Sequence, residues 1–225
     1  MKKLILFLAL SIALFAKTQT LVLGAGCFWG VEKYFENLEG VKEATSGYAG
    51  GSYTNPTYET VLKYKNSQKD IINHAEVVKI VYDDTKISTL KLIKSFWELH
   101  NPTQGNRQGN DRGNNYRSAI YYESNTQKDI ALETKEVYQK LLTNAGYGEI
   151  TTEIKPLDVF YPAETYHQDY LKKNPSGYCP NHATGVKFDN EKTIIDVITP
   201  LKGKEIIVID ALNCVFCEKF KANVT

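Results

Sequence analysis

A short strand that runs through a glycine turn into a helix is the feature that most constrains the fold. Residues 18–24 (TQTLVLG) are a short apolar run ending at a glycine, which predicts a buried strand. From Phe28 onward the apolar residues recur at helical spacing, and Gly40 is typical of the C-terminal end of a helix. Cys27 is therefore predicted to lie at the start of a helix, directly after Gly26.

The rest of the chain alternates between predicted strands and helices. Strands are expected at 75–83, 118–122 and 149–156, and helices at 88–100, 125–143 and 162–173, the last entered through Pro162. Residues 46–59 and 101–117 are rich in Gly, Asn and other polar residues and predict loops. Such long loops do not suit a simple wound parallel sheet. We expect an α+β fold, a two-layer sandwich with a mixed β-sheet and a ferredoxin-like core.

The two ends of the chain differ from its middle. Lys2 and Lys3 precede an apolar run of 13 residues that ends at Ala16, which is typical of an export signal and too short to span a bilayer. We expect a signal peptide at 1–16 and a periplasmic or otherwise exported bacterial protein. The main domain is then 17–190, and residues 191–225 form an extension with a strand–C-x-x-C–helix order.

The charge balance is almost even. Lys and Arg number 27 and Asp and Glu 26, giving a net charge of +1. Neither a nucleic acid nor an acidic surface is favoured as a partner by such a balance. We expect a monomer that does not contact the membrane once its signal is removed.

The setting of Cys27 favours a reactive thiol. A helix N-terminus stabilises a thiolate through its free N–H groups and its dipole, and Gly24 and Gly26 allow positive φ and close approach of the backbone. The alternative is a small buried hydrophobic residue, which is common for a free cysteine. Phe28 begins the apolar stripe and is expected in the core, whereas Trp29 lies off the stripe and is expected to frame a surface pocket.

Glu76 is a candidate acid. Alternation along residues 75–83 puts it on the same face as Val78, Ile80 and Tyr82, and burial raises the pKa of a carboxyl group. The alternative is a solvated charge at the end of the strand.

The other cysteines and the histidines leave more than one interpretation open. Two stapling disulfides are possible, but a domain of this size builds its core without them, and the local settings of the four cysteines differ. The cysteines are Cys27, Cys179, Cys214 and Cys217. The histidines are scattered singly, which argues against a metal site.

Seven segments, in order, resemble the A-type peptide-methionine sulfoxide reductases. They are GCFWG (26–30), GYAGG (47–51), NPTYE (55–59), HAEVV (74–78), QGNDRGNNYRSAIYY (108–122), FYPAETYHQDYL (160–171) and NPSGYC (174–179). The resemblance covers about three quarters of the chain, from about Leu21 to Phe188.

The resemblance implies reduction of methionine S-sulfoxide, free or in proteins, without a bound metal or flavin. By that likeness Cys27 attacks the sulfoxide sulfur and becomes a sulfenic acid. Cys179 then condenses with it to a disulfide, which a thioredoxin-like donor reduces. The resemblance also implies that Glu76 protonates the departing oxygen and that Tyr58 and Tyr116 donate hydrogen bonds to that oxygen. Asp111 would support the site, and Phe28 and Trp29 would bind the methyl group of the substrate. His167 is expected to be mainly structural.

The chain also departs from the family pattern. Residues 63–73 are rich in Lys and Asn where a shorter turn is usual, which puts the loop before Glu76 in doubt, and Asn101 stands where an aspartate is common. A third recycling cysteine near 180–190 is absent. One hypothesis is that Cys214 and Cys217 form a relay dithiol for the catalytic disulfide; the other is that they belong to a remnant with an incidental disulfide.

Two rival functions remain at this point. A thiol hydrolase or acyl transferase would use Cys27 with His74 or His167 as its base and would not need Cys179. A secreted binding module would instead be stapled by disulfides Cys27–Cys179 and Cys214–Cys217.

Overall fold

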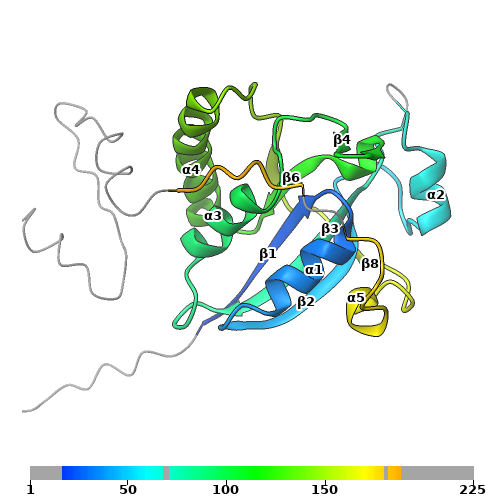
Figure 1. Cartoon of the computed structure of the whole chain (residues 1–225). Helices are drawn as coiled ribbons and strands as arrows, with labels where there is room; N and C mark the ends of the chain where they lie inside the picture. Colours follow the sequence, from blue (N-terminus) through cyan, green and yellow to red (C-terminus); the bar gives the residue numbers. More distant parts are fainter. Residues whose placement is uncertain (1–16, 68–70, 180–181, 189–225) are drawn as a thin grey trace, which may run out of the picture. The chain divides into compact units, whose positions relative to one another are not determined.

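The computed structural model describes residues 17–67, 71–179 and 182–188 (Figure 1). Its main sheet has six strands in the order β7-β6-β1-β3-β2-β8. These strands are β1 Thr18–Ala25, β2 Val41–Ala49, β3 Ala75–Asp83, β6 Ser118–Tyr122, β7 Glu153–Pro156 and β8 Phe160–Pro162. A separate two-stranded hairpin consists of β4 Arg107–Gln108 and β5 Asp111–Arg112. The helices are α1 Phe28–Glu36, α2 Tyr58–Lys63, α3 Thr89–Leu99, α4 Asn125–Asn144 and α5 Tyr170–Lys173, with a 3-10 turn at Asn114–Tyr116.

The sheet is mixed, as expected. Within the described residues, β6 and β7 pair in parallel, and the other neighbouring strands pair antiparallel. β3 lies between β1 and β2, and its Glu76 is opposite Tyr48 of β2. Both residues therefore point to the same face of the sheet.

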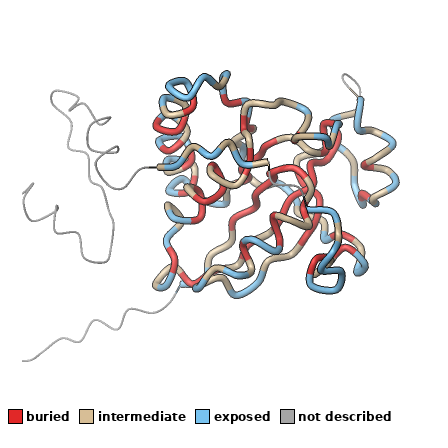
Figure 2. Tube along the Cα trace, viewed as in Figure 1, coloured by how far each residue is buried: buried red, intermediate tan, exposed pale blue. Residues whose placement is uncertain are grey.

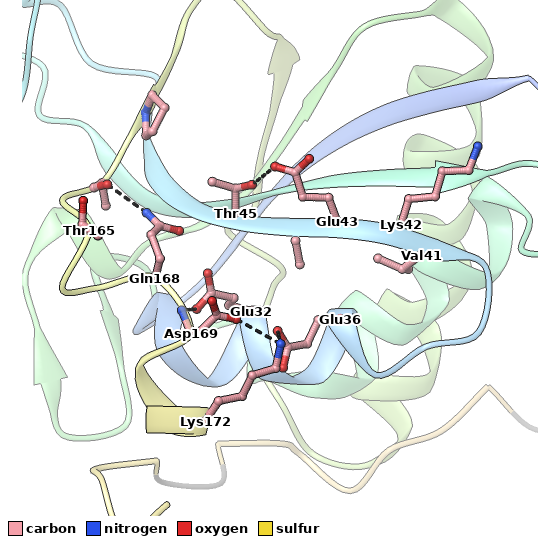
Figure 3. Close-up of a pocket in the computed structure, with 13 residues that line it drawn as sticks. Glu32, Glu36, Val41, Lys42, Glu43, Thr45, Thr165, Gln168, Asp169 and Lys172 are labelled. Atoms are coloured by element: carbon pink, nitrogen blue, oxygen red, sulfur yellow. Dashed lines mark hydrogen bonds and ion pairs between the residues drawn. The ribbon is translucent and has the colours of Figure 1, made fainter. Parts of the chain in front are cut away.

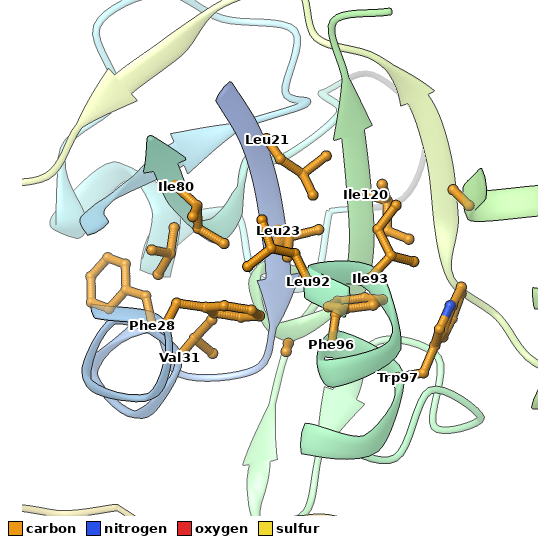
Figure 4. Close-up of a cluster of buried hydrophobic side chains, with 14 of the residues drawn as sticks. Leu21, Leu23, Phe28, Val31, Ile80, Leu92, Ile93, Phe96, Trp97 and Ile120 are labelled. Atoms are coloured by element: carbon orange, nitrogen blue, oxygen red, sulfur yellow. The ribbon is translucent and has the colours of Figure 1, made fainter. Parts of the chain in front are cut away.

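That face carries the main hydrophobic core. Leu21 and Leu23 of β1 and Ile80 of β3 pack there against Phe28 of α1 and Phe96 of α3 (Figure 4). Each of these side chains is fully or almost fully buried. Figure 2 shows the buried residues concentrated along the strands and on the inner faces of the helices. The two-layer arrangement follows from the helical stripes of α1 and α3 meeting one face of the sheet.

A smaller core lies on the opposite face of the sheet. Val22 and Val77, which alternate with the residues of the main core, pack there with Tyr121. Leu157, which follows β7, and Phe160, the first residue of β8, cover them. Burial on both faces explains why residues 21–25 of β1 and most positions of β3 are apolar.

The predicted strands at 75–83 and 118–122 have the observed bounds, but three other predictions were wrong. The predicted loop 46–59 contains the end of β2 and the start of α2. The predicted helix 162–173 is helical only at Tyr170–Lys173, because Pro162 ends β8 and the backbone that follows is tied by side chains to β2 and α1. The predicted loop 101–117 contains β4, β5 and the 3-10 turn.

Several predictions concern residues outside the described ones. The signal peptide at 1–16, the extension at 191–225 and the pair Cys214 and Cys217 all lie there. Within the described ranges, the helices are too short or too polar to cross a membrane.

Candidate active site

Cys27 is the residue that caps the N-terminus of α1. The preceding Gly26 has a φ of +92°, and a Cβ there would lie 2.7 Å from Cγ of Gln108, so no other residue fits without strain. Gly24 does not have the predicted positive φ. It allows close approach instead, since a Cβ would lie 3.1 Å from the Glu76 carbonyl oxygen.

Glu76 is buried beside the start of α1, as its parity in β3 predicts. Its side chain is 2% exposed. Oε2 accepts the backbone N–H of Phe28 at 3.3 Å, and Oε1 accepts the side-chain amide of Asn115 at 3.1 Å. Burial outweighs these two hydrogen bonds and raises the pKa of Glu76 to about 8. The carboxyl group is therefore mostly neutral at pH 7.

The thiol of Cys27 is not held as a thiolate in this state, contrary to expectation. Burial raises its pKa well above the ordinary value, and the carboxyl of Glu76 raises it further. The backbone N–H of Trp29 opposes this effect without making a cap hydrogen bond to the sulfur. Desolvation thus exceeds the stabilising effect of the helix N-terminus. Cys27 as a whole residue is nonetheless only partly buried.

Three further predicted residues, Tyr58, Tyr116 and Asp111, are close enough to this pair to be coupled to it electrostatically. Burial, with the nearby Glu76 carboxyl and Cys27, raises the pKa of Tyr58 to about 12. Burial and Glu76 also raise the pKa of Tyr116. Asp111 contributes to the fields at Cys27, Glu76 and both tyrosines. Both phenols therefore stay protonated and can donate hydrogen bonds near neutral pH.

The aromatic residues after Cys27 form a packed group with His167. Phe28 is 1% exposed, as predicted for a core residue. Trp29 is only half-buried, but it is more constrained than a surface residue, because its ring stacks on Tyr170 with centroids 3.8 Å apart. Its Nε1 also donates to Nδ1 of His167 at 3.1 Å. His167 contacts Phe28, Trp29 and Tyr58, so it shapes the group as well as filling space.

Cys179 is an exposed free thiol near Cys27, which is also free. A Cβ added at Gly30, one helical turn after Cys27, would lie 3.3 Å from Sγ of Cys179. Cys179 also contributes to the field at Cys27. The two thiols are therefore on the same side of α1, and no disulfide joins them, unlike the stapled alternative.

The histidines do not support a hydrolase. His74 accepts from the backbone N–H of Gly51 at 3.2 Å and donates to the carbonyl of Tyr53 at 2.7 Å. Nδ1 of His167 accepts from Trp29, and its Nε2 faces Glu164 at 3.9 Å. Neither ring is hydrogen-bonded to Cys27, so a cysteine–histidine pair is not formed. Across the described residues, no cluster of His, Cys, Asp and Glu could hold a metal ion.

An open groove of about 610 Å³ lies apart from Cys27, lined in part by Glu32, Lys42, Asp169 and Lys172 (Figure 3). Glu32 is 2% exposed, and its two oxygens accept the backbone N–H groups of Ser46 and Asp169 at 3.1 and 2.9 Å. It thereby ties α1 to β2 and to the segment that carries His167. Sequence reasoning missed Glu32 and Asn115, because each acts through partners far away in the chain.

The family model for peptide methionine sulfoxide reductase matches residues 19–196. The chain belongs to this family. The peptide methionine sulfoxide reductase MsrA of Vibrio cholerae is 49% identical over 176 residues, covering 78% of this chain and 80% of the relative. The human mitochondrial peptide methionine sulfoxide reductase is 52% identical over 169 residues, covering 75% of this chain and 69% of the relative.

Solved structures of the family have the same fold. Methionine sulfoxide reductase A of Corynebacterium diphtheriae is 45% identical, with a TM-score of 0.67 over 76% of this chain and 82% of that chain. Mxr1 from Saccharomyces cerevisiae in reduced form is 34% identical, with a TM-score of 0.66 over 76% of this chain and 93% of that chain.

The departures from the family pattern leave the site intact. Asn73, at the end of the Lys/Asn-rich stretch, donates to the carbonyl of Val61 at 2.9 Å and to Oδ1 of Asn114 at 2.7 Å. These bonds hold the chain just before β3. Asn101 accepts from Thr103 through its side-chain oxygen, a role that an aspartate would also fill.

Proposed function

We propose that this chain reduces methionine S-sulfoxide to methionine, with Cys27 as the nucleophile and Glu76 as the proton donor. The observation that carries the proposal is the contact between the Glu76 carboxyl and the first residue of α1, directly after Cys27. A neutral acid is thereby fixed beside a thiol. Membership of the methionine sulfoxide reductase family supports the same reaction.

The two groups together account for the protons. Cys27 Sγ attacks the sulfoxide sulfur, and Glu76 protonates the departing oxygen, which is otherwise a poor leaving group. The thiol proton returns to the Glu76 carboxylate. The protonated oxygen then moves from the sulfoxide sulfur to Sγ. The S–O bond and the transient Sγ–S bond break as the Sγ–O bond forms, so Cys27 becomes a sulfenic acid and methionine leaves as the thioether. Because both groups start neutral, the step needs no net charge in a desolvated site.

The surrounding residues fit the binding of a methyl sulfoxide. Trp29, held by His167, offers an apolar surface for the methyl group, and the buried ring of Phe28 packs against the same His167 ring and supports it from the core. Tyr58 and Tyr116 are protonated donors for the sulfoxide oxygen, and Asp111 supports the site. Charge that develops on the oxygen is stabilised by donors already in place.

The second half of the cycle restores the thiols. Cys179 Sγ attacks the Cys27 sulfenic acid, forming a Cys27–Cys179 disulfide and releasing water. A thioredoxin-like dithiol then supplies two electrons and two protons by thiol–disulfide exchange. Cys214 and Cys217 are proposed as an internal relay for this exchange. Unchanged turnover of a Cys214→Ser/Cys217→Ser variant with a thioredoxin-like donor would remove that part of the proposal.

The setting of the enzyme is proposed from the sequence. Residues 1–16 direct export and are removed after Ala16, leaving a monomeric periplasmic repair enzyme. Sequencing the N-terminus of the protein recovered from a periplasmic extract tests the cleavage. We also propose that β1-α1-β2-β3-α3-β6, with its 6-1-3-2 strand order, is a ferredoxin-like core.

Single-turnover release of methionine tests the proposed chemistry. The reduced wild-type enzyme, without a recycling donor, should release one methionine per molecule from the S epimer and convert two thiols to one disulfide. Cys179→Ser should release the same single methionine but retain a sulfenic acid. Cys27→Ser should release none. Activity in Cys27→Ser would contradict the proposal.

A further inference from the structure

The segment that carries Cys179 lies against hairpin β4–β5 at two points. Tyr178 Oη donates to Oδ1 of Asp111, in β5, at 3.2 Å. Nε2 of His182 faces the other oxygen of the same carboxylate, Oδ2, at 3.9 Å. The residues on both sides of Cys179 therefore converge on one carboxylate.

The turn of the hairpin provides a seat for the imidazole of His182. A Cβ added at Gly109, between β4 and β5, would lie 2.1 and 2.2 Å from Cε1 and Nδ1 of His182. Only glycine at position 109 leaves room for the imidazole of His182. The side chains of His182 and Asp111 are 15% and 17% exposed, so the contact is largely shielded from water.

The same hairpin also contacts the turn before Cys27. Gln108 of β4 fills the space at Gly26, where a Cβ would lie 2.7 Å from its Cγ. Hairpin β4–β5 thus touches the residue before Cys27 and the residues around Cys179. It therefore connects the surroundings of the two thiols through one short hairpin.

We propose that hairpin β4–β5 holds Cys179 within reach of Cys27 and that His182 is a positioning residue for disulfide formation. The inference rests on the proposed function and concerns its second step only. In that step the Sγ–O bond of the Cys27 sulfenic acid breaks and a bond forms between Sγ of Cys27 and Sγ of Cys179. The proton of the Cys179 thiol leaves with the hydroxyl group as water. A tethered thiol reacts at a rate set by its effective concentration, which falls when its segment is released.

Two variants release the segment by different means. His182→Ala removes the imidazole, and Gly109→Ala fills its seat. Gly105→Ala is the matched control, because Gly105 lies in the same loop with a similar φ of +64° against +58° for Gly109, and nothing stands within 4 Å of its Cβ position. Backbone strain is thus similar in both glycine variants, and only one clashes with His182.

The experiment separates the two steps in a single turnover. Reduced enzyme is mixed with methionine S-sulfoxide, and methionine, sulfenic acid and disulfide are followed by rapid quench and mass spectrometry. We expect disulfide formation to slow by about tenfold in His182→Ala and Gly109→Ala, with methionine release unchanged and sulfenic acid accumulating. Gly105→Ala should match the wild type.

Wild-type rates of disulfide formation in both His182→Ala and Gly109→Ala would overturn the inference. Equal slowing in Gly105→Ala would overturn it too, since the effect would then come from the loop backbone. The glycine pair keeps the test decisive if His182→Ala does not fold. Failure of the wild-type enzyme to release methionine would overturn the proposed function, and this inference with it.

Discussion

The carboxyl group of Glu76 accepts the backbone N–H of Phe28 at 3.3 Å. Strand β3 and helix α1 are thereby joined at the residue after the nucleophile. The acid and the thiol are positioned by backbone elements of the core and do not depend on a flexible loop. Sites built on such elements hold their geometry well.

The pH dependence of activity should follow Glu76. Its pKa of about 8 means that raising the pH above this value removes the proton needed for the departing oxygen. We expect kcat/KM to fall about tenfold per pH unit above this point. Initial rates from pH 6 to 10 check this. A flat profile up to pH 10 would show that another group supplies the proton.

A Glu76→Gln variant should become more stable relative to the wild type as the pH rises. The folded-state pKa of about 8 lies above the ordinary value of 4.5. As the pH rises between these values, the unfolded chain loses the proton that the folded chain keeps, so wild-type stability falls. Glutamine avoids this loss, and we expect it to gain on the order of a few kcal/mol relative to the wild type between pH 4.5 and 8.

Urea unfolding of both proteins at pH 5 and pH 8 measures this difference. The amide of Asn115, which donates to Glu76, can rotate to accept from the new glutamine. The variant should therefore fold, and it should lack activity. A difference in unfolding free energy that does not change with pH would contradict the raised pKa.

Trp29→Phe should weaken substrate binding more than turnover. The change removes the donor to His167 and reduces the stacking on Tyr170. We expect KM to rise about tenfold, since an aromatic contact and a hydrogen bond are each worth about 1 kcal/mol, while kcat changes by about threefold or less. Steady-state kinetics measure both.

Trp97→Phe is the matched control for that change. Trp97 is fully buried in α3, and its indole donates to Thr134 at 2.9 Å. The variant should lower the unfolding free energy by about 1 to 2 kcal/mol and leave KM unchanged. An equal rise of KM in both variants would mean that Trp29 acts only through stability.

Glu32→Ala should destabilise the domain far more than Glu36→Ala, although both residues lie on α1 and line the same groove. Removing the Glu32 carboxyl leaves the N–H of Asp169 without its acceptor and weakens the bonding at Ser46. We expect a loss of about 3 kcal/mol. Glu36 pairs with the exposed Lys172, and its loss should cost at most about 1 kcal/mol. Thermal unfolding of the two variants compares them, and equal losses would contradict the role of Glu32.

Sequence patterns were most informative where local and tertiary preferences agree. Alternation along β3 predicted the buried face of Glu76, because a buried strand fixes the parity of its side chains. Helical spacing from Phe28 likewise predicted the start of α1. The antiparallel pairing of β1 with β3, which brings these two elements together, follows from neither pattern.

Other elements depend on partners that the local sequence does not contain. The glycine-rich end of β2 resembles a loop, but Gly47 lies under the ring of Phe160, where a Cβ would stand 2.4 Å from Cζ. The segment before α5 has a helical pattern, yet Gln168 donates to the carbonyl of Ser46, and Asp169 has a left-handed φ of +53°. The raised pKa of Cys27 also depends on tertiary burial, which position at a helix N-terminus does not reveal.

The separation of the two site cysteines along the chain has a consequence for proteolysis. Cys27 and Glu76 lie in the first half of the chain, whereas Cys179 follows α5, near the end of the described residues. A protease cut between α5 and Cys179 would leave the nucleophile and its acid in place but remove the second thiol. Such a fragment would react with one sulfoxide and then stop, so limited C-terminal trimming would turn a renewable catalyst into a reagent that is consumed.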